Sequence, residues 1–220
     1  MIQAVTSRPA HERRWPASLA VAVVIVIQLV LPRQTAPSWW PALVAAEALM
    51  LSAVVAGNPL HLNRVNRRLR VAGAALAVLV IAVNGVRLAQ LLLAIADGRP
   101  LTAKTLVASG GLIWVTNVVA TAVAFWELDG AGPFARAGMT DGRRPADLLF
   151  PQMTGLPGWD PETWRPSFFD YVFVAFTTAT AFSPTDTMPT TGRAKALMML
   201  TAGVSLLTVG VVAARAVSLF

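Results

Sequence analysis

A run of hydroxyl and carboxyl side chains near the end of the chain is the part of the sequence best suited to chemistry. The run follows an aromatic apolar turn and contains Thr177, Thr178, Thr180, Ser183, Thr185, Asp186 and Thr187. Such oxygens can replace water around an ion, and they are costly when exposed to lipid. The segment therefore favours a polar passage rather than a simple apolar helix.

The composition indicates an integral membrane protein. Of 220 residues, 55% are hydrophobic and 13% charged, the mean hydropathy is +0.60, and several apolar runs approach bilayer-spanning length. The net charge of +7 comes mostly from arginines beside these runs, a pattern typical of membrane topology signals rather than of nucleic-acid binding.

No catalytic or metal-binding pattern is present in the sequence. The chain has no cysteine, and its two histidines, His11 and His61, lie far apart on segments that flank apolar runs. No Ser-His-Asp set or phosphate-binding loop occurs. We therefore expect no enzyme activity, cofactor or metal.

Five apolar runs predict an all-α membrane protein with about five transmembrane helices. They cover residues 17–31, 41–56, 71–96, 105–127 and 194–220. Between 128 and 165, Gly, Pro, Asp and Arg accumulate, which predicts a loop outside the hydrocarbon. Its acidic residues are interpreted as solvated: Asp129, Asp141, Asp147, Asp160 and Glu162.

Residues 168–183 are too few to cross the bilayer. A crossing helix needs about 20 apolar residues, whereas this segment has a Thr-rich end and stops before Pro184. A half-depth helix would have to return without helical hydrogen bonds, and such backbone is tolerated only inside protein or beside water. We therefore expect a re-entrant helix and loop before the last span.

The segment TTATAFSPTDTMP resembles the pore loop of the potassium-channel-like superfamily, with Pro189 at the position of that family's proline. The resemblance covers about residues 168–217. It implies a tetrameric channel module over 105–220: outer helix 105–127, loop 128–167, pore helix and filter-like loop 168–189, and inner helix 192–219. Residues 1–104 would form three preceding transmembrane helices. The implied constriction is Thr180, Ala181, Phe182, Ser183, Pro184, Thr185 and Asp186.

The filter itself departs from the family pattern. Ser183 and Thr185 stand where the family has glycines, and Pro184 fixes its own φ between them. A hydroxyl-rich constriction replaces a potassium filter. An Asp186 ring would favour cations, although Arg193 is near enough in sequence to neutralise it.

The last span carries a hydroxyl stripe at Thr201, Ser205 and Thr208, spaced i, i+4 and i+7. Such a stripe either lines a water-filled cavity or bonds to a neighbouring helix. In the fourth span, Gly110, Gly111, Asn117 and Thr121 predict close helix packing.

Glu47 and Arg87 are ionisable groups inside predicted spans, at similar depth. We expect a buried ion pair between them, with Asn84 and Gln90 nearby, that either locks two helices together or serves function.

The distribution of Lys and Arg predicts a cytoplasmic N-terminus. With a re-entrant segment, thirteen of the 18 Lys and Arg residues fall on the N-terminal side and four on the other, with Arg87 inside a span. The layout also resembles an uncharacterised family of bacterial integral membrane proteins, which implies the bacterial inner membrane.

An oligomeric ion channel, most simply a tetramer, is the function predicted first, because one loop cannot enclose a passage. Its partners would be permeating ions, lipid and further copies of the chain, with no nucleic acid. A non-conducting scaffold or sensor with a degenerate pore, and an anion-permeable channel or small-solute transporter, are the alternatives.

Overall fold

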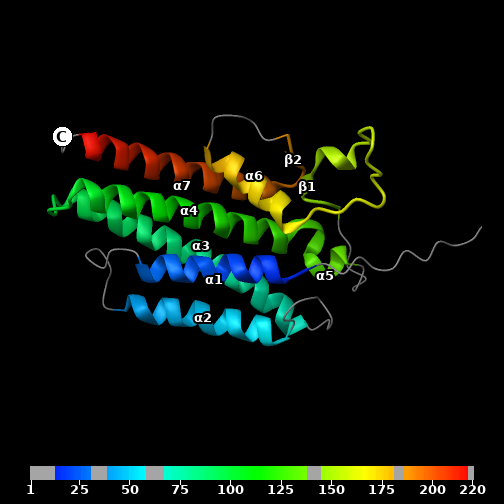
Figure 1. The fold of residues 1–220 in the computed structure, drawn as a ribbon, viewed down its shortest axis with the longest axis horizontal. Helices are drawn as coiled ribbons and strands as arrows, with labels where there is room; N and C mark the ends of the chain where they lie inside the picture. Colours follow the sequence, from blue (N-terminus) through cyan, green and yellow to red (C-terminus); the bar gives the residue numbers. More distant parts are fainter. Residues whose placement is uncertain (1–12, 31–38, 58–66, 138–144, 181–185, 218–220) are drawn as a thin grey trace, which may run out of the picture.

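The computed structural model describes residues 13–30, 39–57, 67–137, 145–180 and 186–217. These residues are almost entirely helical (Figure 1). The long elements are α1 (Trp15–Val30), α2 (Trp40–Gly57), α3 (Arg67–Ala96), α4 (Ala103–Leu128), α6 (Phe168–Thr180) and α7 (Gly192–Val217). Short elements fill the loop before and after α6: η2 (Asp129–Ala131), α5 (Pro133–Arg136), β1 (Leu148–Leu149), η3 (Pro151–Met153) and β2 (Met188–Pro189).

Four of the described helices are long and apolar enough to cross a membrane. They lie within Trp40–Gly57, Arg68–Ala96, Ala103–Ala131 and Gly192–Arg215. The first predicted span corresponds to α1, whose 16 residues fall short of the about 20 that a crossing requires. A multi-pass membrane protein is thus supported, and the fifth crossing stays a prediction.

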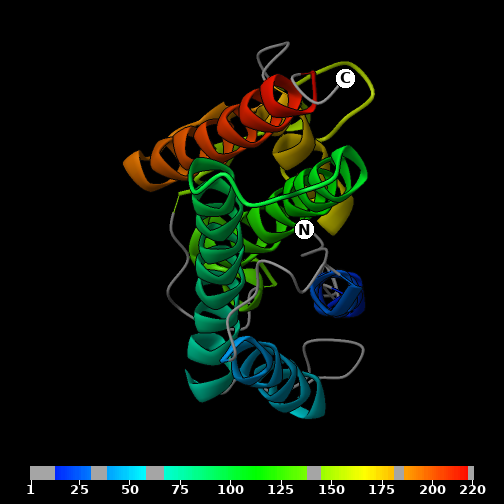
Figure 2. The same cartoon turned by 90° about the vertical axis from the view of Figure 1, so that its left-hand side faces the viewer.

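Helix α4 is the centre of the bundle. It packs against α1 and α3 on one side and against α6 and α7 on the other, as the end-on view shows (Figure 2). Of the residues in the most apolar 18-residue stretch of α4, 61% are buried, against 22% in the corresponding stretches of α2 and α7. Small residues permit this close packing: a Cβ at Gly110 would lie 2.7 Å from Val212 Cγ2. The packing role predicted for Gly110 is confirmed, whereas Gly111 faces open space.

Candidate functional site

Helix α6 begins at a turn in which Ser167 donates to Asp170, and it is half as long as its neighbour α4. The Ser167 backbone N–H and hydroxyl both donate to Asp170 Oδ2 at 2.7 Å, which holds the first turn. With 13 residues the helix spans about 20 Å, and α4 with 26 spans about 39 Å. Aromatic contacts give its direction.

Two edge-to-face ring pairs show that α6 runs antiparallel to α4. The Trp126 and Phe168 ring centroids lie 6.4 Å apart near the end of α4, and those of Trp114 and Phe176 lie 5.7 Å apart near its middle. Tyr171, Val174, Ala175 and Ala179 form the buried face of α6. Helix α6 therefore starts beside the C-terminal end of α4 and ends, at Thr180, beyond the middle of α4.

Helix α7 starts at the same end of the bundle as α6 and runs in the same direction (Figure 1). Thr201 bonds to Thr121 and Val212 packs on Gly110, so α7 is also antiparallel to α4. The pairing of β1 with β2 places Met188 and Pro189 against Leu148 and Leu149, before α7 begins.

Of the predicted constriction, the structure describes the two ends. Thr180 closes α6 and donates its hydroxyl to Thr177 O at 3.0 Å, and Asp186 is exposed next to β2. Ala181, Phe182, Ser183, Pro184 and Thr185 lie outside the described residues. Their role as a constriction stays a prediction.

At Thr201 and Ser205 the hydroxyl stripe of α7 bonds to α4, which is the second of the two roles expected from the sequence. Thr201, Ser205 and Thr208 are at most 2% exposed. The Thr121 and Thr201 hydroxyls lie 2.8 Å apart, and Asn117 Nδ2 donates to Thr201 O at 3.0 Å and to Ser205 Oγ at 3.4 Å. Thr201 and Ser205 therefore form interhelical hydrogen bonds, because polar side chains in an apolar bundle pair with each other. Thr208 instead donates to Val204 O within α7 and borders a cavity of about 350 Å³ beside Gly110 and Gly111.

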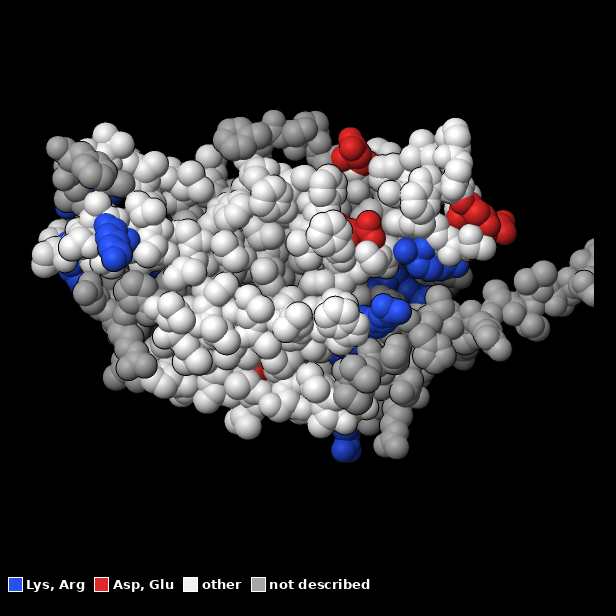
Figure 3. Space-filling view, viewed as in Figure 1, with Lys and Arg blue, Asp and Glu red and all other residues white. Residues whose placement is uncertain are grey.

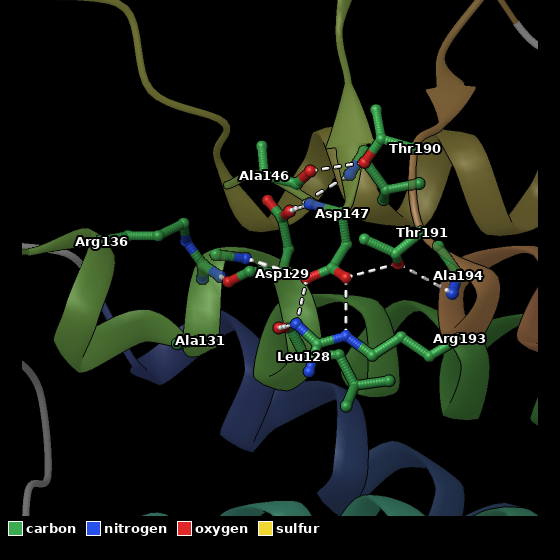
Figure 4. Close-up of polar contacts among 12 residues, drawn as sticks. Leu128, Asp129, Ala131, Arg136, Ala146, Asp147, Thr190, Thr191, Arg193 and Ala194 are labelled. Carbon is green, nitrogen blue, oxygen red and sulfur yellow. Dashed lines mark hydrogen bonds and ion pairs between the residues drawn. The ribbon is translucent and has the colours of Figure 1, made fainter. Parts of the chain in front are cut away.

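A dense hydrogen-bonded cluster ties together the starts of α6 and α7 and the end of α4 (Figure 4). Asp129 Oδ1 accepts from the Asp147 and Leu148 backbone N–H groups at 2.6 and 3.2 Å, and Asp129 Oδ2 accepts from the Tyr171 hydroxyl at 2.7 Å. These contacts connect the loop and α6 to one carboxylate. We call Asp129, Asp147, Tyr171, Thr191 and Arg193 the base cluster.

Asp147 is the charged centre of the base cluster. Arg193 forms a bidentate ion pair with Asp147, in which Nε donates to Oδ1 at 2.6 Å and Nη2 donates to Oδ2 at 2.5 Å. The Thr191 hydroxyl also donates to Oδ1, at 2.5 Å. The Gly130 N–H donates to Oδ2 at 3.2 Å. Burial by itself would raise the pKa of Asp147, but the hydrogen bonds from Arg193 and Thr191 and the arginine's charge outweigh it, so this pKa is lowered.

The base cluster corrects two sequence interpretations. The loop sequence predicts that Asp129 and Asp147 are solvated, yet they are 1% and 2% exposed. Arg193 was expected to be available to Asp186, yet it forms the ion pair with Asp147 instead. In the sequence, Thr191 and Arg193 are recognisable only as polar residues close before the last apolar span. Their spacing does not identify Asp147 as the group to which they bind.

The predicted pair of Glu47 and Arg87 is wrong for the described residues. Glu47 is fully buried, and Gln28 lies beside it, but neither side chain completes a hydrogen bond there. The Arg87 guanidinium lies 4.4 Å from the Trp40 ring centroid, and its Nη1 donates to Gln90 Oε1 at 3.4 Å. Trp40 lies on the same buried face of α2 as Glu47 but seven residues, about two turns, before it, so the Arg87 guanidinium and the Glu47 carboxylate differ in depth.

The buried ion pair in this half of the bundle joins Arg14 and Glu127. Arg14 Nη2 and Glu127 Oε1 lie 3.0 Å apart, with both side chains almost fully buried. Gly73 in α3 leaves the space for them, since a Cβ there would overlap the carboxylate. Sequence reasoning missed this pair because Arg14 precedes α1 and was counted with the flanking charges.

No family model, curated protein or solved structure matches this chain.

Proposed function

We propose that the chain is one subunit of a homo-oligomeric ion channel, most simply a tetramer, with the segment from Thr180 to Asp186 as its constriction. The observation that carries the proposal is the geometry of α6. This helix covers half the length of α4, and α7 starts again at the end where α6 began. The connection from Thr180 to Asp186 therefore joins the middle of the bundle to its end.

A connection of that kind favours a wet passage. Non-helical backbone at membrane depth is stable only when it is enclosed by protein or lines water. One chain contributes one such segment, so several copies are needed to enclose a pore. Large apolar side chains exposed on α7, among them Met199, Leu206 and Val209, offer a surface against which a second copy can pack.

The proposed location is the bacterial inner membrane, with the N-terminus and the re-entrant loop on the cytoplasmic side. Arg13, Arg136, Arg165 and Arg193 belong to the end of the bundle where α1, α6 and α7 begin. Blue side chains gather at this right-hand end (Figure 3). The excess of arginine supports a cytoplasmic position for it.

A non-conducting scaffold is the second candidate, and the buried hydroxyls favour it. Thr177, Thr178 and Thr180 all donate to backbone carbonyls of α6, and the stripe on α7 is used in packing. These hydrogen bonds stabilise the fold whether or not ions cross the protein. The two candidates differ in whether ions cross a membrane that holds the assembled protein.

Ion flux from proteoliposomes distinguishes them. The purified protein, with its oligomeric state measured by native mass spectrometry, is reconstituted over a potassium gradient, and the release of potassium is followed. The channel proposal expects flux above that of empty vesicles. Replacing Asp186 by Asn should reduce cation flux about threefold or more, because the acidic mouth concentrates cations.

Asp160→Asn is the matched control, since Asp160 is an exposed acid of the loop before α6 and accepts a hydrogen bond from Thr163 in the same loop. It should leave the flux unchanged. A folded oligomer that releases no potassium would replace the channel by the scaffold. A monomer, or equal flux from Asp186→Asn and the parent, would contradict the constriction.

A further inference from the structure

A cavity of about 580 Å³ opens between the starts of α1 and α6 and the short helix α5. Its size is typical of a site for a small organic ligand or a lipid headgroup. It lies outside the proposed constriction, at the arginine-rich end of the bundle. Its walls combine two kinds of side chain.

The first kind is cationic. Arg13, Arg136 and Arg165 line the cavity, and its described lining includes no Asp or Glu. Arg136 is fixed in place, with Nη1 donating to Trp126 O at 2.8 Å and to Asp129 O at 2.6 Å. Arg165 donates to the neighbouring Trp164 carbonyl, and no ion pair is formed by Arg13 or Arg165 within the described residues. Three guanidinium groups in a described wall that holds no carboxylate favour an anionic ligand, above all a phosphate.

The second kind is apolar and aromatic. Trp15, Phe168 and Phe169 line the same cavity, and Trp15 and Phe169 are exposed at its edge. From there an exposed apolar surface continues along α1 through Leu19 and along α6 through Phe173. Tryptophan at such an edge is typical of the membrane interface. The ligand should therefore carry long apolar chains as well as negative charge.

We propose that this cavity binds an anionic phospholipid of the surrounding membrane. The phosphate lies between Arg13 and Arg165, with Arg136 as the fixed cation behind it, and the acyl chains follow the exposed surfaces of α1 and α6. A free phosphate ion would bind only to the arginines, so the aromatic wall of the cavity and the apolar surfaces of α1 and α6 would stay uncovered.

The bound lipid would brace the start of α6. Arg136 bonds to the Asp129 carbonyl, while Asp129 also holds Tyr171 of α6, and Phe168 packs on Trp126. Arg136 thus connects the wall of the cavity to the base cluster. Binding does not depend on conduction, so its test is separate from the flux experiment.

Native mass spectrometry of the full chain in a neutral detergent measures the proposed binding. Phosphatidylglycerol and phosphatidylcholine with identical acyl chains are titrated separately, and inorganic phosphate is added in a third arm. We expect one phosphatidylglycerol per subunit to be retained, with at least about tenfold tighter binding than phosphatidylcholine.

Charge-neutralising variants locate the site. Arg13→Gln with Arg165→Gln should weaken phosphatidylglycerol binding about tenfold or more and remove the preference over phosphatidylcholine. The matched control is Arg99→Gln with Lys104→Gln, at the other end of the bundle. This double variant should keep the affinity for phosphatidylglycerol and the preference for it over phosphatidylcholine. Circular dichroism checks that each variant is folded.

Equal binding of the two lipids by the parent would overturn the proposal, as would an unchanged preference in a folded Arg13→Gln, Arg165→Gln variant. Inorganic phosphate that displaces phosphatidylglycerol at equal concentration would also overturn it, because the arginines alone would then account for the site.

Discussion

Asp147 and Glu47 are both buried carboxylates, but of the two only Asp147 accepts hydrogen bonds from the described residues. Each Asp147 oxygen accepts hydrogen bonds from Arg193, and Thr191 and the Gly130 N–H add further donors. Neither Glu47 oxygen has a hydrogen-bond partner among the described residues. Burying an ionised carboxylate is costly unless it is paired and bonded, so only the first site is built to hold a charge.

The position of each residue in its element explains the difference. Asp147 lies in a loop, where the N–H groups of Gly130 and of Asp147 itself are not used by a helix and can bond to carboxylates. Glu47 lies in the middle of α2, where helical hydrogen bonds already use the backbone donors. A carboxylate there depends on side chains from neighbouring helices.

The largest effect is expected from Asp147→Ala. The change leaves Arg193 without its carboxylate and removes the link between the loop and α7, so the free energy of unfolding should fall by about 3–5 kcal/mol. Thermal unfolding in detergent, followed by circular dichroism, measures it. Asp160→Ala, an exposed acid of the same loop, should change the melting temperature little. Similar melting temperatures for the two variants would contradict the comparison.

The pH dependence of stability sharpens this test. Because the pKa of Asp147 in the folded protein is lowered from the ordinary 3.8, its contribution is present above that value and is lost as the pH falls through the lower folded pKa. The parent should therefore lose more stability than a folded Asp147→Asn variant when the pH is taken from 7 to below 3.8. Equal losses of stability in the parent and in Asp147→Asn would show that the ionised Asp147 carboxylate does not stabilise the fold.

Gly73→Ala should have an intermediate effect, because it extends the comparison to a paired charge in the N-terminal half. The new Cβ overlaps Glu127 and crowds Arg14, so the ion pair must shift and the free energy of unfolding should fall by about 1–3 kcal/mol. Gly85→Ala in the same helix has open space around it and serves as the control. Unfolding midpoints of both variants decide the outcome; a Gly73→Ala protein as stable as Gly85→Ala would mean that the pair is dispensable.

The smallest effect is expected from Glu47→Gln. No ion pair is lost, and the amide removes a buried acid, so stability should change by less than about 1 kcal/mol or increase. The same unfolding assay applies. A loss as large as that of Asp147→Ala, together with a Glu47→Arg, Arg87→Glu double variant as stable as the parent, would reinstate the predicted pair and end the contrast.

Much of the helical layout could be predicted from the sequence. Apolar length identified α2, α3, α4 and α7, and the short aromatic run before Pro184 identified α6 as a helix too brief to cross. The small residues of α4 predicted its close packing. These features depend on composition and on spacing along one helix, which the sequence states directly.

The partners of the polar groups could not be predicted in the same way. Thr201, Ser205 and Thr208 share one helix face in any α-helix, but the rotation of α7 about its axis decides whether that face meets water or α4. Depth counted along the helices likewise suggested Glu47 and Arg87 as partners, but the long Arg87 side chain places its guanidinium at Trp40, about two turns from Glu47.

The sequence alone determined that this is a helical membrane protein in which α6 is too short to cross, because hydrophobic length is a property of the chain. Only the tertiary structure decided that Asp147 meets Arg193, that Arg14 meets Glu127 and that Glu47 has no such partner within the described residues. Those outcomes depend on how helices rotate and where loops return, which side-chain packing sets across segments far apart in sequence.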